Sequence, residues 1–435
     1  MPAEQLHSFK EQVCSNHGNW TTPKGLQGQS FQHPRWLHPD RWSQTAVSET
    51  HSAIRWQPYL VYADIQRPGS MALKGKKHDK GKAADTLKST SHLQSSQAVA
   101  QPSEEPRIPL ELQQLMLNVF REALPIPADS NLRQIIQVVK SHLYNRDFAS
   151  AFSAEQLLNV YALRWSASRA LAYADIFVEF DVKHRWLGDR ITNVPDQAQD
   201  PGLAQILCVG GGAGAEIVAL AAIGNIFPML QLSITAVDVA DWSPVLSKLT
   251  ATVTKSPVLS QYASAAKVDA NRALIAPERF HVEFKQHDIL ECSVEELRLL
   301  VAESSLVTIM FTLNELFSAS TAKTTAFLLN LTEIMKPKSW LLVVDSPGSY
   351  SEVTLGKGNG PKRYPMKWLL DHTLQNLAGS EENETGKWKK QEADDSKWFR
   401  LNDKLRYHVE LESMRYQFYV YQRQAEGHHP GGNVS

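Results

Sequence analysis

Short apolar runs alternate with longer amphipathic or apolar segments over the second half of the chain. The segments between the runs, such as 214–226 and 327–337, have the length and periodicity of helices. Strands that alternate with helices predict a parallel sheet with helices on both of its faces. The five strand-like runs are 205–211, 232–240, 281–289, 305–313 and 339–347.

The C-terminal pattern is different. Residues 405–423 contain two aromatic and β-branched runs close together. Such runs predict an antiparallel hairpin at the edge of the sheet. Residues 379–397, which are rich in acidic side chains and lysine, predict a solvated insertion without an assigned function.

Helical spacing dominates the region before the sheet. Segments 110–124 and 131–144 carry apolar residues at helical intervals, and a third helix is expected from about Ser153 to Phe180. We therefore assign residues 109–195 to a helical N-terminal extension that packs against a sheet domain at 200–425.

Residues 1–108 and 426–435 lack this order. Residues 71–108 are rich in Lys, Gly, Ser and Gln and predict a disordered tail, as do residues 426–435. We expect residues 1–70 to be an over-extension of the gene model, with Met71 as the true start. The lysines between positions 74 and 82 are either a solvated tail, a phosphate contact or a nuclear signal.

Composition narrows the classes of function. The formal net charge of -1, from 45 basic and 46 acidic side chains, gives no overall attraction to nucleic acid, so such binding requires a local patch. Three separated cysteines without a CxxC predict neither a disulfide framework nor a metal site. No apolar run is long enough to span a membrane and no secretory signal is visible, so we expect an intracellular protein without a membrane partner.

The most informative motif is the glycine cluster in ILCVGGGAGAEIVAL. Gly210, Gly212 and Gly214 follow a strand directly and lead into a helix. Glycine allows a tight turn and the close approach of a ligand, as in the nucleotide-binding turn of Rossmann-like folds. The alternative is a turn without a ligand.

Acidic and amide side chains end the other strands. Asp238 after the second strand is placed to accept hydrogen bonds from ribose hydroxyls, or is a helix cap. Asp288 after the third is a candidate for the adenine amino group, or an ordinary strand-end residue. Asn314 and Glu315 should face the reaction centre, unless they only begin a helix, and Asp345 borders the same crevice.

Two enzyme classes share this arrangement of a strand, a glycine turn and a helix at the start of the sheet domain: nicotinamide oxidoreductases and class I methyltransferases. The antiparallel C-terminal hairpin favours the methyltransferases. No separate substrate domain with a catalytic His or a Lys and Tyr pair is visible. The predicted fold is therefore α/β, a Rossmann-like class I methyltransferase fold with a mostly parallel sheet, an antiparallel C-terminal edge hairpin and a helical N-terminal extension, and the predicted cofactor is S-adenosylmethionine.

Several segments resemble the fungal large-subunit (25S) ribosomal RNA uridine-N3 methyltransferases. The resemblance covers about residues 109–425, and ALRWSASRALAY and VDVADWSPVL are more specific than the glycine cluster because no general rule of the fold requires them. The segments that carry it are 146–173, 206–220, 234–249, 311–318 and 341–353.

The resemblance implies methyl transfer to N3 of one uridine in large-subunit rRNA, free or within a pre-ribosomal particle. It also implies residence in the nucleus (nucleolus), the cytoplasm or both. The cofactor would be held by Gly210, Gly212, Gly214, Asp238, Asp288 and Asn314.

The chemistry of the substrate suggests further roles. Uridine N3 is a weakly acidic imide, so a base helps, and Glu315 is the first candidate and Asp345 the second. Side chains that either stack on the uridine or pack in the core are Trp242, Phe317 and Tyr350. RNA contacts are expected from Arg164, Arg169 and the loop 355–368, which includes Lys357, Lys362, Arg363 and Lys367. The alternative for the loop is a flexible surface insertion.

Other functions fit the same residues. One is a methyltransferase that acts on a protein or a small molecule, which the balanced charge mildly favours. Another is a non-catalytic ribosome-assembly scaffold that retains the fold. A nicotinamide dehydrogenase is the fourth hypothesis.

Overall fold

The computed structural model describes most of the chain after residue 106. The described ranges are 107–126, 131–188, 202–265, 268, 271–348, 350–353, 362–378 and 387–425. The expectations for residues 1–106 and 426–435, including the start at Met71 and the lysine cluster, lie outside the described residues.

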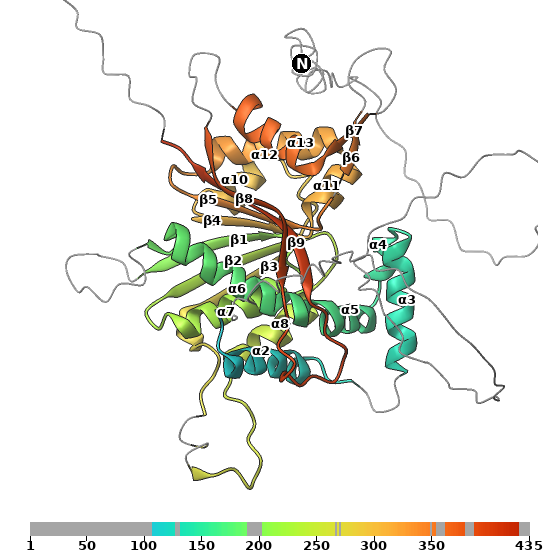
Figure 1. Cartoon of the computed structure of the whole chain (residues 1–435), viewed down its shortest axis with the longest axis vertical. Helices are drawn as coiled ribbons and strands as arrows, with labels where there is room; N and C mark the ends of the chain where they lie inside the picture. Colours follow the sequence, from blue (N-terminus) through green and yellow to red (C-terminus); the bar gives the residue numbers. More distant parts are fainter. Residues whose placement is uncertain are drawn as a thin grey trace, which may run out of the picture. The chain divides into compact units, whose positions relative to one another are not determined.

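A seven-stranded sheet forms the centre of this region (Figure 1). Its strand order is β3-β2-β1-β4-β5-β9-β8, and the first five strands in that order are mutually parallel. The order reverses between β1 and β4, which creates a ligand crevice at the carboxyl ends of these strands in folds of this kind. The five parallel strands confirm the sequence prediction: β1 (Leu203–Val209), β2 (Gln231–Asp238), β3 (Phe280–Gln286), β4 (Leu306–Met310) and β5 (Trp340–Asp345).

An antiparallel hairpin closes one edge of the sheet, as predicted, but one of its strands was assigned wrongly. β9 (Met414–Arg423) pairs with β5 and with β8 (Trp388–Phe399). β8 comes from the segment that was expected to be a solvated insertion. An edge strand tolerates many charged side chains, and only the ends of β8 are buried. The first predicted run, 405–411, is a connection whose Leu405 and Val409 pack into the core.

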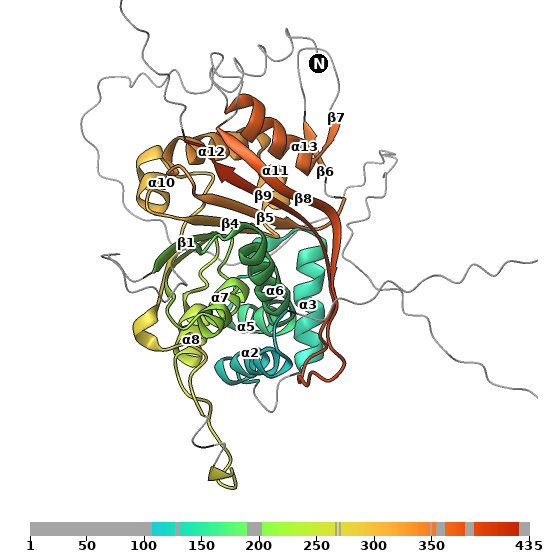
Figure 2. The same cartoon turned by 60° about the vertical axis from the view of Figure 1, so that its left-hand side comes forward.

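Helices cover both faces of the sheet (Figures 1 and 2). Ile206 and Cys208 of β1 belong to the core on one face, and Leu207 and Val209 to the core on the other. The first face is covered by α6 (Ala167–His184), α7 (Ala215–Ile226) and α8 (Ser243–Val253); the second by α10 (Val294–Val301), α11 (Leu313–Ala319), α12 (Thr321–Ile334) and α13 (Met366–Asp371).

Two short elements follow β5. β6 (Tyr350–Val353) and β7 (Lys362–Pro365) form a separate two-stranded antiparallel sheet, and α13 leads into a π-helical segment (His372–Leu377). Positions 355–361 of the predicted basic loop lie outside the described residues.

The N-terminal helices share the core of the sheet domain. They are α2 (Leu110–Ala123), α3 (Leu132–Tyr144), α4 (Phe148–Ala151) and α5 (Glu155–Tyr161). Met116 and Phe120 of α2 are buried in the same cluster as α6, α7 and α8. The third predicted helix is not continuous, because a π-helical turn (Ala162–Ser166) separates α5 from α6. This turn contains Arg164, Trp165 and Ser166, and π-turns of this kind are frequent at functional sites.

Aromatic packing fixes α6 to the sheet. The ring of Phe180 stacks on Trp186 at 5.7 Å and meets Trp340 of β5 edge-on at 5.3 Å. Both contacts have the geometry that aromatic pairs favour. Since Phe180 is fully buried, its removal leaves a cavity between the helix and the sheet.

We predict that Phe180→Ala lowers the free energy of unfolding by about 3–5 kcal/mol, the usual cost of a buried Phe→Ala change. Val182→Ala is the matched control on the same helix, because Val182 is 72% exposed. It should change stability by less than about 0.5 kcal/mol. Urea unfolding followed by circular dichroism measures both, and equal effects would contradict the role given to Phe180.

Candidate active site

The glycine turn lies at the carboxyl end of β1, as the sequence predicted. Gly210 and Gly214 have φ values of +74° and +81°, which are costly for any residue with a Cβ. The Gly210 N–H donates to the carbonyl of Val237 at 2.8 Å, so the turn is tied to the end of β2.

Close packing by protein side chains is a second reason for these glycines. A Cβ on Gly212 would lie 2.2 Å from the indole of Trp242, and one on Gly210 would lie 2.1 Å from the hydroxyl of Thr312. Any side chain here displaces the ends of neighbouring elements. The sequence suggested only that the glycines make room for a ligand.

Asp238 joins the end of β2 to the glycine turn. Its Oδ2 accepts the N–H of Gly212 at 3.2 Å, and its Oδ1 accepts that of Ala240 at 3.3 Å. Burial raises the pKa of Asp238 to about 6, although these N–H groups oppose the shift. Asp238 is not the cap of α8, because Asp241 accepts the N–H of Ser243 there.

Asp345 joins the ends of β4 and β5. It is buried, and its two oxygens accept the N–H of Asn314 at 3.0 Å and of Ser346 at 2.7 Å. Burial raises the pKa of Asp345 to about 6, and the nearby Glu315 adds to this shift. The Oδ1 atom of Asn314 is buried and has no hydrogen-bond partner among the described residues.

Glu315 stands beside this pair and is more open. Its side chain is 37% exposed, and its Oε2 lies 3.9 Å from Nη1 of Arg146, whose side chain is 51% exposed. Burial raises the pKa of Glu315, and Arg146 partly opposes that shift. Arg146 comes from the turn between α3 and α4, so the helical extension reaches the candidate base.

A family model described as a putative S-adenosylmethionine-dependent methyltransferase matches residues 120–422. This match spans more than half of the chain, including every residue of the site described above. The chain belongs to this methyltransferase family.

Among curated proteins, this methyltransferase is similar to the 25S rRNA (uridine(2843)-N(3))-methyltransferase of Saccharomyces cerevisiae. The identity is 34% over 337 residues, which cover 72% of this chain and 85% of the yeast protein. The resemblance seen in the sequence motifs is thereby confirmed.

Solved methyltransferase structures are similar at lower identity. A methyltransferase from Methanosarcina mazei matches at 13% identity, covering 51% of this chain and 93% of that chain, with a TM-score of 0.30. Human N-acetylserotonin methyltransferase matches at 12% identity, covering 72% of this chain and 67% of that chain, with a TM-score of 0.26.

The cofactor of this methyltransferase is S-adenosylmethionine, as predicted, and the carboxyl edge has groups that fit it. The Asp238 carboxylate suits the ribose hydroxyls. The unpaired Oδ1 of Asn314 suits an amino group, because a buried acceptor without a partner costs about 1–3 kcal/mol. Bound there, the cofactor supplies an electrophilic methyl group on a sulfonium.

Among the described residues, no group of three or more His, Cys, Asp or Glu side chains is arranged to hold a metal ion.

Asp288 lies in the turn after β3, the strand beside β2. Its Oδ1 accepts the N–H of Leu290 at 3.0 Å, and its neighbour Ile289 is buried. The structure therefore places Asp288 at the predicted edge. Its role toward the adenine stays a prediction.

Two features of the site had no signal in the sequence: the backbone of Phe311, and the packing of Arg169, which was expected only as an RNA contact. Phe311, directly after β4, has a φ of +56°, and its N–H donates to the Val344 carbonyl at 2.7 Å. The guanidinium of Arg169 lies 4.7 Å from the Phe311 ring and donates to the hydroxyl of Tyr161 at 2.7 Å. A strained backbone costs about 1–3 kcal/mol and is typically found at functional sites.

Glu216 is a further buried acid that the sequence did not point to. It lies in the first turn of α7, beneath the glycine turn, and accepts a hydrogen bond from the hydroxyl of Thr308 in β4. Burial raises its pKa to about 7. A Cβ on Gly211 would lie 2.9 Å from its carboxylate, so Glu216 supports the turn from below.

The predicted stacking residues are mostly core residues. Trp242 and Phe317 are buried, and Trp242 packs against Phe152 at 5.0 Å and Tyr161 at 5.6 Å. Neither ring is accessible to a uridine in this structure, so the core-packing alternative is correct for both. The side chain of Tyr350 lies outside the described residues.

Most residues that were predicted to contact RNA either form ion pairs within the protein or lie outside the described residues. Arg164 is buried and forms ion pairs with Glu412 and Glu410, so its assignment to RNA is wrong. Lys367 forms an ion pair with Asp395. Lys357 and the side chains of Lys362 and Arg363 lie outside the described residues.

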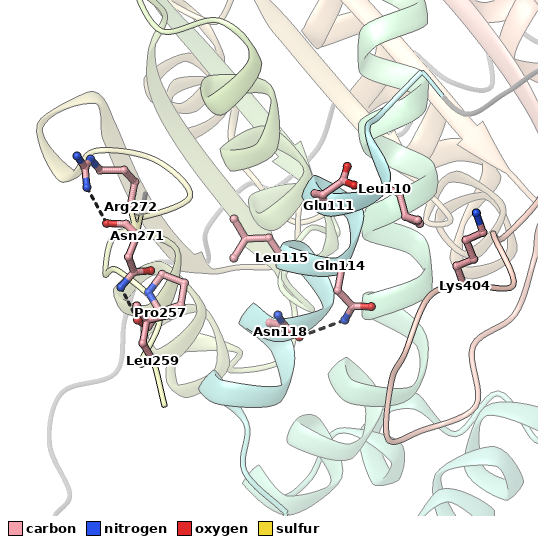
Figure 3. Close-up of a pocket in the computed structure, with 10 residues that line it drawn as sticks. All are labelled: Leu110, Glu111, Gln114, Leu115, Asn118, Pro257, Leu259, Asn271, Arg272 and Lys404. Carbon is pink, nitrogen blue, oxygen red and sulfur yellow. Dashed lines mark hydrogen bonds between the residues drawn. The ribbon is translucent and has the colours of Figure 1, made fainter. Parts of the chain in front are cut away.

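An open pocket of about 640 Å³ lies between α2 and the connection from α8 to β3 (Figure 3). None of the candidate site residues lines it.

Among the described residues, no helix is long and apolar enough to cross a membrane.

We predict that Asp238→Asn weakens S-adenosylmethionine binding at pH 8 roughly tenfold to a hundredfold, since hydrogen bonds to a charged acceptor contribute about 1.5–3 kcal/mol. In the unchanged protein, affinity should fall as the pH drops through about 6, because the raised pKa of Asp238 makes its carboxylate take up a proton there. Isothermal titration calorimetry from pH 5.5 to 8 measures both effects.

Asp241→Asn is the control, because Asp241 is a nearby exposed carboxylate outside the turn. It should leave both the affinity and its pH dependence unchanged. If the S-adenosylmethionine affinity of Asp238→Asn depends on pH in the same way as that of the unchanged protein, a group other than Asp238 is responsible for the titration.

Proposed function

We propose that this methyltransferase modifies N3 of a uridine in large-subunit rRNA. The observation that carries the proposal is the cluster at the ends of β4 and β5, where Glu315 is partly open beside the fixed pair Asn314 and Asp345. The similarity to the yeast rRNA enzyme, over 85% of that protein, supports the choice of substrate.

Glu315 is the better of the two candidate bases. Asp345 is only 3% exposed and both of its oxygens accept backbone N–H groups, so its role is to position Asn314. Glu315 keeps its carboxylate accessible, and its raised pKa brings it closer to a working pH near neutrality. It would take the N3 proton as the methyl group is transferred.

The reactive atom sets a condition on the RNA. N3 lies on the Watson–Crick edge, so the uridine must be unpaired when it enters the site. Alignment with the methyl group then contributes most of the rate, because methyl transfer depends mainly on orientation. The rigid ends of β4 and β5 suit such alignment.

The test uses rRNA from a yeast strain that lacks the matched yeast enzyme. The full chain is incubated with this rRNA or with its pre-ribosomal particles and labelled S-adenosylmethionine, and N3-methyluridine is measured by mass spectrometry of nucleosides. We expect product with this rRNA and none with rRNA that is already methylated. Transfer only to protein or to a small molecule, or no transfer at all, would refute the proposal.

We predict that Glu315→Gln lowers kcat about 10²- to 10⁴-fold, the usual contribution of a general base. The deficit should shrink at high pH, where the imide ionises by itself, and the affinity for S-adenosylmethionine should stay the same. Arg146→Ala should move the acidic limb of the pH–rate profile to higher pH, because Arg146 lowers the pKa of Glu315. If the loss of kcat in Glu315→Gln were the same at every pH, Glu315 would not be the base.

The location of the protein follows from the same proposal. An rRNA substrate is consistent with residence in the nucleolus or, for a late particle, in the cytoplasm. Imaging of the tagged full chain, with and without lysines 74–82, distinguishes the compartments. Localisation away from both would count against an rRNA substrate.

A further inference from the structure

We propose that Trp398, Arg400 and Arg415 form a docking surface for single-stranded RNA, here named the Trp398 surface. The inference rests on the proposed rRNA substrate and specifies where the RNA beside the reactive uridine is held. The sequence motifs placed RNA contacts elsewhere, on Arg164, Arg169 and the basic loop 355–368.

The Trp398 surface combines a partly exposed aromatic ring with two guanidinium groups. Trp398 lies on the edge strand β8 and is 41% exposed. The guanidinium carbon of Arg400 lies 3.9 Å from the ring centroid, and that of Arg415 lies 5.9 Å from it. Arg415 Nε also donates to the hydroxyl of Ser396 at 2.9 Å, which orients its guanidinium.

The charge on the Trp398 surface is not neutralised by its neighbours. Within the described part of the chain, neither Arg400 nor Arg415 forms an ion pair, whereas Glu412 pairs with Arg164 and Asp395 with Lys367. Asp394 lies directly opposite Phe418 in the β8–β9 ladder, hence on the other face of the sheet from Trp398. The two guanidinium groups are therefore free to contact phosphates.

The position of the Trp398 surface links it to the site. Trp398 lies directly opposite Arg415, and Gln417, two residues along β9, lies opposite Asp345 of β5. Alternation along the strand puts Arg415 and Gln417 on the same face, about 7 Å apart along β9. Gln417 Nε2 donates to the carbonyl of Ser346 at 2.8 Å, which anchors this face beside Asp345.

β8 and β9 continue beyond the ends of the parallel strands in both views (Figures 1 and 2). The Trp398 surface is therefore on the carboxyl edge of the sheet, the edge that carries Asn314 and Glu315. RNA held there would present a nucleotide a short distance along the strand to the reaction centre.

The chemistry of the surface favours RNA over a protein partner. Every base offers a π face, and aromatic and arginine side chains are the usual platforms for single strands. A stable protein interface buries roughly 800 Å² on each partner around an apolar core, which a single exposed ring does not supply. Among the described residues, Trp398 is the one large apolar side chain of β8 or β9 that is exposed.

The test measures binding of the full chain to a fluorescently labelled, single-stranded, uridine-containing RNA by anisotropy. Loss of one stacked base predicts a roughly 5- to 150-fold weaker Kd for Trp398→Ala. Trp398→Phe keeps a π face and should retain most of the affinity. The double variant Arg400→Ala and Arg415→Ala should bind more weakly. Its slope of log affinity against log salt concentration should become shallower by about 0.7 for each phosphate that is no longer neutralised.

Two controls come from the connection between α8 and β3, which enters the sheet at its opposite edge. Tyr262→Ala removes an exposed aromatic ring and Arg272→Ala an exposed guanidinium, and neither should change the Kd for RNA. S-adenosylmethionine affinity and the thermal midpoint should be unchanged in all variants, which excludes unfolding as the cause.

A Kd for Trp398→Ala within twofold of the unchanged protein overturns the inference, as does a change in self-association without a change in RNA affinity. If the unchanged protein methylates rRNA and Trp398→Ala binds normally, the surface is wrong while the proposed function stands. If Trp398→Ala loses RNA binding but the unchanged protein does not methylate rRNA, the proposed function fails while the surface stands.

Discussion

Carboxylates that accept backbone N–H groups hold the carboxyl edge of the sheet together. Asp238 binds the glycine turn to β2, and Asp345 binds the start of α11 to β5. Hydrogen bonds to a charged acceptor contribute about 1.5–3 kcal/mol each, but burial opposes the charge, and the balance leaves both pKa values at about 6. The positions of Asn314 and Glu315, and with them the proposed chemistry, depend on these few bonds.

The helical extension is part of this edge. Arg146 reaches Glu315 from the turn before α4, and Tyr161 packs against Trp242, which in turn limits Gly212 to a glycine. On the far side, Lys397 of β8 pairs with Glu179 of α6. The extension therefore contacts the glycine turn, the candidate base and the edge hairpin, and is more than a cover for the sheet.

The sequence was sufficient for the parallel strands and for most strand-end polar residues. Apolar runs bounded by Gly, Asp or Pro have few other interpretations, and the carboxyl ends of parallel strands always lie at one edge. The sequence led to a wrong assignment where its composition fitted both a strand and a loop. β8 carries lysines and aspartates because it is an edge strand, and that composition is also typical of a loop.

Side-chain environments were harder to predict than elements. Arg164 and Trp242 stand in specific motifs, yet both are buried by partners far away in the sequence. The positive φ of Phe311 has no sequence signal, because the residue is not glycine or asparagine. Trp398 had no signal either, since one tryptophan in a charged segment shows its exposure only when the strand order is known.

The ion pair between Arg164 and Glu412 has a consequence for the order of events during synthesis. Its partners are 248 residues apart, and β9, which fills the place between β5 and β8, follows Glu412. A contact of such long range cannot form until the segment that carries Glu412 has left the ribosome. Until then the sheet ends at β5 and the buried guanidinium lacks its carboxylate. The enzyme therefore completes this edge of its sheet only once the segment that carries β9 has left the ribosome.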